Sequence, residues 1–253
     1  MFTKENEPLK NHTTFRVGGN AKIFSEPENE NEFLELVKNL KSKGEKFFIL
    51  GGGSNLVFSD SGFNGTVIST SHLNGNEIVS ENSAGGNSVS EKEISGGVRT
   101  DKSGEIFVRC GAGASMSMVI NFVKKNCISG FEQFSGLPGT VGGAVYMNAR
   151  CFEKSVSDIL ESVEYFDLEK LKKCEYKFNA ADWDYKKSPF QNEAKTGTEL
   201  AITNSSKIIV SATLRLKSEN QTEENRQKIV SECRHYNEER ISKGHFKYPS
   251  AGS

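Results

Sequence analysis

SGFEQFSGLPGTVGGAVYMNA, residues 129–149, is an apolar stretch with five glycines, one proline and no lysine. The interiors of helices and strands tolerate few glycines, and a surface loop would be more polar. Because glycine lacks a Cβ atom, a backbone rich in it can approach a large ligand closely. The segment therefore predicts a backbone that lies against a planar cofactor ring. A glycine-rich turn between two core elements is the alternative.

A second glycine-rich turn follows a predicted strand. Residues 46–50 read KFFIL, an apolar run without alternation that is typical of a strand buried on both faces. Residues 51–53 are all glycine, and successive backbone N–H groups in such a turn form a nest for phosphate oxygens. Ser54 and Asn55 add side-chain donors. No Gly-Lys-Ser/Thr follows, so the pattern does not indicate ATP hydrolysis.

A third turn, CGAGASM at residues 110–116, lies between a predicted strand at 105–110 and a predicted helix at 115–126. Ser115 is a suitable N-cap for that helix. The turn begins like the dinucleotide fingerprint, but Met116 stands where the third glycine belongs, and no strand ending in an acid follows about 20 residues later. A Rossmann domain is therefore disfavoured, whereas three separate glycine turns fit a different flavin-binding design.

Composition indicates a cytoplasmic enzyme. The 253 residues carry a net charge of −1 with 26% charged residues, which gives no broad electrostatic case for binding nucleic acid or an anionic membrane. No apolar run approaches the roughly 20 residues of a membrane span, and residues 1–10 are too polar for a signal peptide. Five cysteines without paired spacing favour reduced thiols. The four histidines form no ligand pattern, so we expect no metal site.

The hydrophobic pattern predicts an α+β organisation. Residues 31–43 predict a helix that ends at Gly44. Its apolar side chains recur at helical spacing: Phe33, Leu34, Val37 and Leu40. Strands are predicted at 46–50, 66–70, 105–110, 161–168 and 207–216, the last of which closes the sheet. A charged helix over 223–243 presents a thin apolar stripe to the domain: Ile229, Cys233, Tyr236 and Ile241.

Residues 81–104 stand apart in composition. These 24 residues contain five serines, five glycines and four apolar residues. Such a segment buries too little apolar surface to offset its ordering entropy. It predicts a disordered surface insertion without a catalytic role, and a partner-binding loop is the alternative.

The order of the motifs resembles the UDP-N-acetylenolpyruvoylglucosamine reductase (MurB) family. The motifs are TTFRVGGNA at 13–21, GGGSNL at 51–56, GAG at 111–113, GFE at 130–132 and GLPGTVGGA at 136–144. The match runs from residue 11 to the last residue, apart from the insertion. It implies a PCMH-type (vanillyl-alcohol-oxidase) FAD-binding fold of two α+β subdomains. It assigns residues 1–217 to FAD binding and 218–253 to a linker helix and the start of a shortened C-terminal substrate domain.

The resemblance also implies the cofactors and the reaction. FAD is expected to bind non-covalently to the glycine turns, through Gly51, Gly52, Gly53, Ser54, Asn55, Gly111, Gly113, Gly136, Pro138, Gly139, Thr140, Gly142 and Gly143. NADPH reduces the FAD, and a hydride then passes to the enolpyruvyl double bond of the nucleotide sugar. The product, UDP-N-acetylmuramate, is a peptidoglycan precursor. The expected partners are these small molecules, and the expected state is a monomer.

The family's Tyr-Arg-x-Ser-x-Phe pattern matches YKKSPF at residues 185–190. The resemblance implies that Lys186 stabilises the carbanion-like enolate, that Tyr185 binds beside it, and that Ser188 and Phe190 hold the loop. Lysine keeps the charge of the family's arginine but lacks its bidentate fork. From the residues alone, 185–187 is a solvated charged turn.

The family's proton donor, a serine in Ser-Ala-Gly-Ser, matches Ser253 at the end of the sequence. From the residues alone, Ser253 belongs to a frayed terminus. In the family the chain continues from here into a domain that carries a glutamate and much of the substrate pocket. Arg150 is another departure, because many relatives have glycine there. Two hypotheses follow: a reductase that needs further residues for turnover, and a non-catalytic FAD-binding module.

Overall fold

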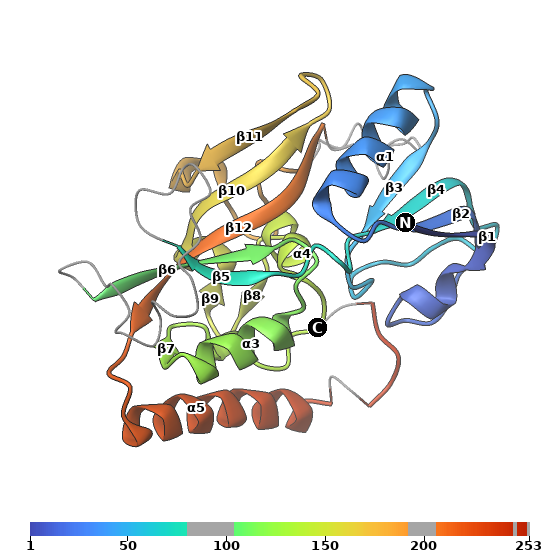
Figure 1. Cartoon of the computed structure of the whole chain (residues 1–253). Coiled ribbons are helices and arrows are strands. Elements are labelled where there is room, and N and C mark those ends of the chain that lie inside the picture. The colour runs from blue at the N-terminus through green and yellow to red at the C-terminus, as the bar shows by residue number, and fades with distance from the viewer. Residues whose placement is uncertain (80–103, 192–205, 245–246, 252–253) are drawn as a thin grey trace.

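Two sheets lie side by side in the computed structural model, which describes residues 1–79, 104–191, 206–244 and 247–251 (Figure 1). The predicted insertion at 81–104, apart from its last residue, lies outside the described residues, and so does Ser253. None of the described helices is long and apolar enough to cross a bilayer.

The first sheet has four strands in the order β1–β2–β4–β3. Their bounds are β1 Phe2–Pro8, β2 Asn20–Glu26, β3 Phe47–Leu50 and β4 Phe63–Ser69. Strands β2, β4 and β3 run parallel, and β1 is antiparallel to β2. The predicted strands at 46–50 and 66–70 are confirmed as β3 and β4. Because β3 is parallel to β4, the glycines that follow β3 lie at the carboxyl edge of this sheet.

Helix α1 (Glu30–Ser42) packs on the first sheet and confirms the helix predicted over 31–43. Its four periodic apolar side chains are all buried. Asn29 caps the helix, because its side chain accepts a hydrogen bond from the Glu32 N–H at 3.0 Å. Gly44 follows the last turn with a φ of 67°, a left-handed conformation that suits glycine.

The second sheet is antiparallel throughout and has the order β11–β10–β12–β6–β5, with β7 paired to β12. The bounds are β5 Asn76–Val79, β6 Glu105–Gly111, β7 Ile128–Ser129, β10 Leu160–Asp167, β11 Lys172–Lys177 and β12 Lys207–Ser218. The strand predicted at 207–216 is present as β12, but it lies between β10 and β6 and does not close the sheet. The pairing partners of β12 are β10 and β6, which are distant in sequence and leave no local signal.

The second sheet and the helices that share its core form the second subdomain. These helices are α3 Met116–Lys125, α4 Val141–Tyr146 and α5 Glu223–Ser242. Short elements complete the chain: η1 Leu9–His12, η2 Glu132–Phe134, η3 Val156–Ile159, η4 Ala180–Asp182, β8 Arg150–Cys151 and β9 Lys154–Ser155. Ser115 caps α3 as predicted, since its hydroxyl accepts the Met118 N–H at 3.1 Å. Helix α4 corrects the expectation that the glycine-rich segment is non-helical.

Helix α5 lies along α3 at the base of the second subdomain (Figure 1). Ile229 and Cys233 are buried in the main core, as the predicted stripe requires. Ile241 is 54% exposed, and Arg240 is buried in its place. Residue 240 lies about 20° around the helix from Ile229, whereas residue 241 lies about 120° away. The position of each residue around the helix, and not the hydropathy of Ile241, therefore decides which side chain is buried.

The core has three clusters of buried side chains. The largest joins the second sheet to α3, α4 and α5. Another joins the two sheets, because α1 and β3 pack on Phe166, Leu168, Ile208 and Val210. The third lies on the other face of the first sheet, around Phe24 and Val67. The shared second cluster fixes one sheet against the other.

Candidate functional site

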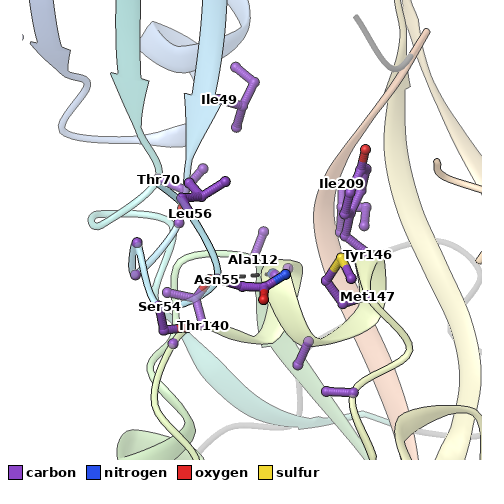
Figure 2. A pocket seen from close by; sticks show the side chains of 18 of the residues that line it. Ile49, Ser54, Asn55, Leu56, Thr70, Ala112, Thr140, Tyr146, Met147 and Ile209 are labelled. Atoms are coloured by element: carbon purple, nitrogen blue, oxygen red, sulfur yellow. Dashed lines mark hydrogen bonds between the residues drawn. The ribbon is translucent and has the colours of Figure 1, made fainter. Parts of the chain in front are cut away.

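A cavity of about 520 Å³ lies between the two sheets, a volume in the range of ligand pockets. Its walls come from the end of β3 with the following glycine turn, from residues 137–150, from Tyr185 and Lys186, and from the start of β12. Figure 2 shows Ile49, Ser54 and Leu56 on one side and Tyr146, Met147 and Ile209 on the other. We refer to the side of Ser54 and Leu56, which carries the glycine turns, as the glycine wall. We refer to the side of Tyr146, Met147 and Ile209, together with Tyr185, Lys186, Arg150 and Lys207, as the cationic wall.

The glycine wall consists of residues 51–55 and 138–143, which contain ten of the predicted cofactor-binding residues: Gly51, Gly52, Gly53, Ser54, Asn55, Pro138, Gly139, Thr140, Gly142 and Gly143. Gly53 has a φ of 63°. Its own Cβ position is filled by the backbone of residues 12 and 13. Within the described residues, nothing accepts a hydrogen bond from the N–H groups of residues 52–55. The turn, which lines the cavity, therefore has backbone donors available for a ligand.

At most glycines of this wall, neighbouring atoms of the protein fill the space that a Cβ would occupy. A Cβ on Gly52 would lie 2.7 Å from the Cα of Gly139, and one on Gly142 would lie 2.9 Å from the Cβ and carbonyl oxygen of Ala112. Gly142 also donates its N–H to the Ala112 carbonyl at 2.8 Å. At Gly143 the nearest atom would be the Thr140 Oγ1 at 3.6 Å, which leaves room. Close packing of turns, which the sequence alone does not distinguish from ligand contact, thus accounts for Gly52, Gly139 and Gly142.

The remaining predicted cofactor-binding glycines, Gly111, Gly113 and Gly136, do not line the cavity. A Cβ on Gly111 would meet the Leu73 carbonyl oxygen, and one on Gly113 would meet that of Thr70. A Cβ on Gly136 would meet Asn237 of α5. These three positions hold neighbouring backbone or side chains, and their contact with a cofactor remains a prediction.

Tyr185 and Lys186 belong to the cationic wall. Tyr185 is 69% exposed, and the Lys186 Nζ lies 5.4 Å from the centroid of its ring. The backbone of Lys186 is left-handed, with a φ of 54°. Ser188 donates its hydroxyl to the Tyr146 carbonyl oxygen at 2.7 Å, and Phe190 is buried among aromatic rings. Both contacts support the expected role of these residues in holding the loop.

Arg150 and Lys207 also line the cationic wall, and sequence reasoning assigned neither of them to a site. Arg150 lies in β8, just after the glycine-rich segment. Lys207 begins β12 and donates to the Pro189 carbonyl oxygen at 3.5 Å. Among the residues that the structure describes, no aspartate or glutamate lines the cavity. Burial raises the pKa of Tyr146 above its ordinary value of 10.0, so its phenol stays protonated and remains a donor. The cavity is therefore suited to an anionic ligand.

The described residues fit FAD. The free N–H groups of residues 52–55 suit the oxygens of its diphosphate. Ala112, Leu137 and Ile209 give the cavity apolar surfaces for flat rings. All five cysteines are free, and Cys110, Cys127, Cys151 and Cys233 are buried. Burial raises the pKa of Cys110 to about 12, which makes it an unreactive thiol.

Comparisons with known proteins identify the family of this chain. Residues 21–169 match the FAD binding domain family. The reductase of Treponema denticola is 39% identical over 249 residues, which are 98% of this chain and 68% of that protein. The reductase of Borreliella burgdorferi is 33% identical over 246 residues, which are 97% of this chain and 67% of that protein. Both carry the name UDP-N-acetylenolpyruvoylglucosamine reductase.

Solved structures are similar in fold. The crystal structure of the Thermus caldophilus UDP-N-acetylenolpyruvylglucosamine reductase matches with a TM-score of 0.65 at 24% sequence identity. The match covers 99% of this chain and 72% of the chain of that reductase. A cholesterol oxidase from Brevibacterium sterolicum matches with a TM-score of 0.53 at 13% sequence identity, and the match covers 86% of this chain and 38% of the chain of that oxidase. The fold is thus the PCMH type found in FAD oxidases. The chain belongs to the UDP-N-acetylenolpyruvoylglucosamine reductase family and carries its FAD-binding domain.

Proposed function

We propose that this chain binds FAD non-covalently in the cavity and uses NADPH to reduce UDP-N-acetylenolpyruvoylglucosamine to UDP-N-acetylmuramate. The observation that carries the proposal is the cavity itself, which a turn with unpaired N–H donors and several cations line together, and which has no carboxylate among its described lining residues. We place the protein in the cytoplasm as a monomer whose partners are small molecules. We assign residues 1–217 to FAD binding, and α5, which follows them, packs on the main core.

Each functional residue has a proposed part in the reaction. Bound FAD supplies hydride transfer. Lys186 supplies a fixed positive charge where negative charge develops beside the carboxylate of the enolpyruvyl group. Tyr185, next to it on the same loop, contacts the substrate. Ser253 delivers the proton to carbon, a general-acid step that contributes about 10²–10⁴-fold.

The alternative is an FAD-binding module without turnover. Lysine at residue 186 favours it, because a lysine cannot form the bidentate contact of an arginine. Both functions require bound FAD, so the colour of the purified protein does not separate them.

NADPH oxidation separates the two functions. We expect the chain to oxidise NADPH faster when UDP-N-acetylenolpyruvoylglucosamine is added, and UDP-N-acetylglucosamine, which lacks the double bond, to have no such effect. Equal rates with both compounds would contradict the reductase and support the module.

A further inference from the structure

Arg150 and Lys186 line one cavity from two loops that are hydrogen-bonded to each other. Asn148 donates its side-chain N–H to the Asp184 carbonyl oxygen at 3.0 Å, which ties the residues two positions before each cation. Ser188 ties the same loops through the Tyr146 carbonyl. The two cations are thus held on one wall by their loops and not only by their own flexible side chains.

The backbone at both loops is strained in a way that requires support. Asn148 has a φ of 42° and Lys186 a φ of 54°. A left-handed backbone at a non-glycine residue is unfavourable and persists where neighbouring contacts fix it. Gln191 donates to the Lys186 carbonyl oxygen at 3.1 Å and contacts the Met147 sulfur at 3.5 Å. The loop that presents Lys186 is therefore fixed to the segment that presents Arg150.

Neither cation is neutralised within the part of the chain that the structure describes. Among the described residues, no carboxylate forms an ion pair with Arg150 or Lys186. The described lining of the cavity that both residues share contains no aspartate or glutamate. A guanidinium forms paired hydrogen bonds with carboxylate or phosphate oxygens, whereas an ammonium acts as a point charge. Together they suit a single oxyanion.

We propose that Arg150 and Lys186 form a two-cation site for an oxyanion of the nucleotide sugar, with Arg150 as the bidentate member. This inference rests on the proposed function. Figure 2 shows Tyr146 and Met147, which bear the hydrogen bonds to this loop, across the cavity from Ser54 and Leu56. The oxyanion therefore binds opposite the glycine wall, apart from the proposed diphosphate of FAD. Its source is either the carboxylate of the enolpyruvyl group or the diphosphate of the nucleotide.

Calorimetric titration of the full chain tests the site without relying on turnover. The probes are UDP-N-acetylenolpyruvoylglucosamine and UDP-N-acetylglucosamine, which share the diphosphate and differ in the carboxylate. We expect Arg150→Gln to raise the Kd about tenfold, the effect of one charge-assisted hydrogen bond. Arg150→Lys should recover part of the affinity. Arg234→Gln removes an exposed arginine of α5, outside the cavity lining, and should leave the Kd unchanged.

The pattern of losses identifies the oxyanion. A loss confined to the enolpyruvyl compound assigns the site to its carboxylate, and equal losses with both compounds assign it to the diphosphate. Unchanged Kd values in Arg150→Gln, or a parent chain that binds neither compound, would overturn the inference. Flavin content and NADPH oxidation of the parent chain are measured separately, so failure of the proposed function is distinguished from failure of the site.

Discussion

The two walls of the cavity are built in different ways. The glycine wall is made by backbone atoms of turns that pack directly on one another, so that a Cβ at Gly52 or Gly142 has no space. The cationic wall is made by side chains, and hydrogen bonds hold the loop of its exposed Tyr185 and Lys186 in place. Changes in the first wall should therefore alter folding and cofactor binding together. Changes in the second should alter ligand binding and turnover while leaving the fold intact.

The largest effect is expected for Gly142→Val. Its side chain would overlap Ala112 and push α4 away from β6, and overpacking of this kind costs about 1–3 kcal/mol. We expect a lower free energy of unfolding in denaturant and loss of bound FAD in the absorbance spectrum. Gly143→Ala is the matched control for stability, because its Cβ has room within the protein and should leave the free energy of unfolding nearly unchanged. Stoichiometric FAD in Gly142→Val would contradict the account of this wall.

Lys186→Ala tests the cationic wall through the reaction. Stopped-flow absorbance should show normal flavin reduction by NADPH and a second half-reaction that is about 10²–10³-fold slower, because the charge next to the developing enolate is lost. Lys186→Arg should retain the rate or increase it, since arginine keeps the charge and adds the bidentate fork. The free energy of unfolding should stay close to that of the parent chain. Loss of stability comparable to Gly142→Val would erase the distinction between the two walls.

Arg240→Ala tests whether α5 supports the glycine wall from behind. The buried Arg240 donates to the Ser135 carbonyl oxygen at 3.4 Å and to the Cys151 sulfur at 3.2 Å. A Cβ on Gly136 would also contact its side chain. Leaving the buried carbonyl unpaired costs about 1–3 kcal/mol, so we expect a lower melting temperature and weaker FAD binding. Arg234→Ala on the exposed face is the control, and equal effects of the two changes would contradict this role.

The smallest effect is a pH dependence at Glu132. Burial raises its pKa above the ordinary value of 4.5, and its Oε1 is buried without a hydrogen-bond partner among the described residues. The folded state therefore favours the protonated carboxyl, and this stabilisation is lost as the pH rises from 4.5 through the raised pKa. Glu132→Gln should flatten the fall in the free energy of unfolding over that range. An unchanged pH profile would show that Glu132 does not contribute.

Elements with strong local patterns were predictable from the sequence. The helical spacing in residues 31–43 and the apolar run at 46–50 each identify their element within a residue or two. β1 and β11 were not predicted, because both are edge strands whose side chains are mostly exposed and mostly polar or charged. Only pairing with β2 and β10, respectively, makes these segments strands.

The site was predictable where its residues are contiguous. The turn at 51–55 and the segment at 138–143 line one cavity, as their composition suggested. Lys207 was missed because its place depends on the pairing of β12 with the distant strand β10. Arg150 was missed because nothing in its local hairpin of β8 and β9 indicates that the residue lines a cavity. The glycines were interpreted as ligand contacts, although packing between turns produces the same pattern.

Titration of the flavin-depleted chain with FAD tests the central claim most directly. Fluorescence of free FAD should fall until one FAD is bound per chain, and Gly142→Val under the same conditions should bind none, because the turns that form the glycine wall can no longer pack together. A parent chain that binds no FAD, or a Gly142→Val chain that binds it as tightly as the parent, would contradict the account.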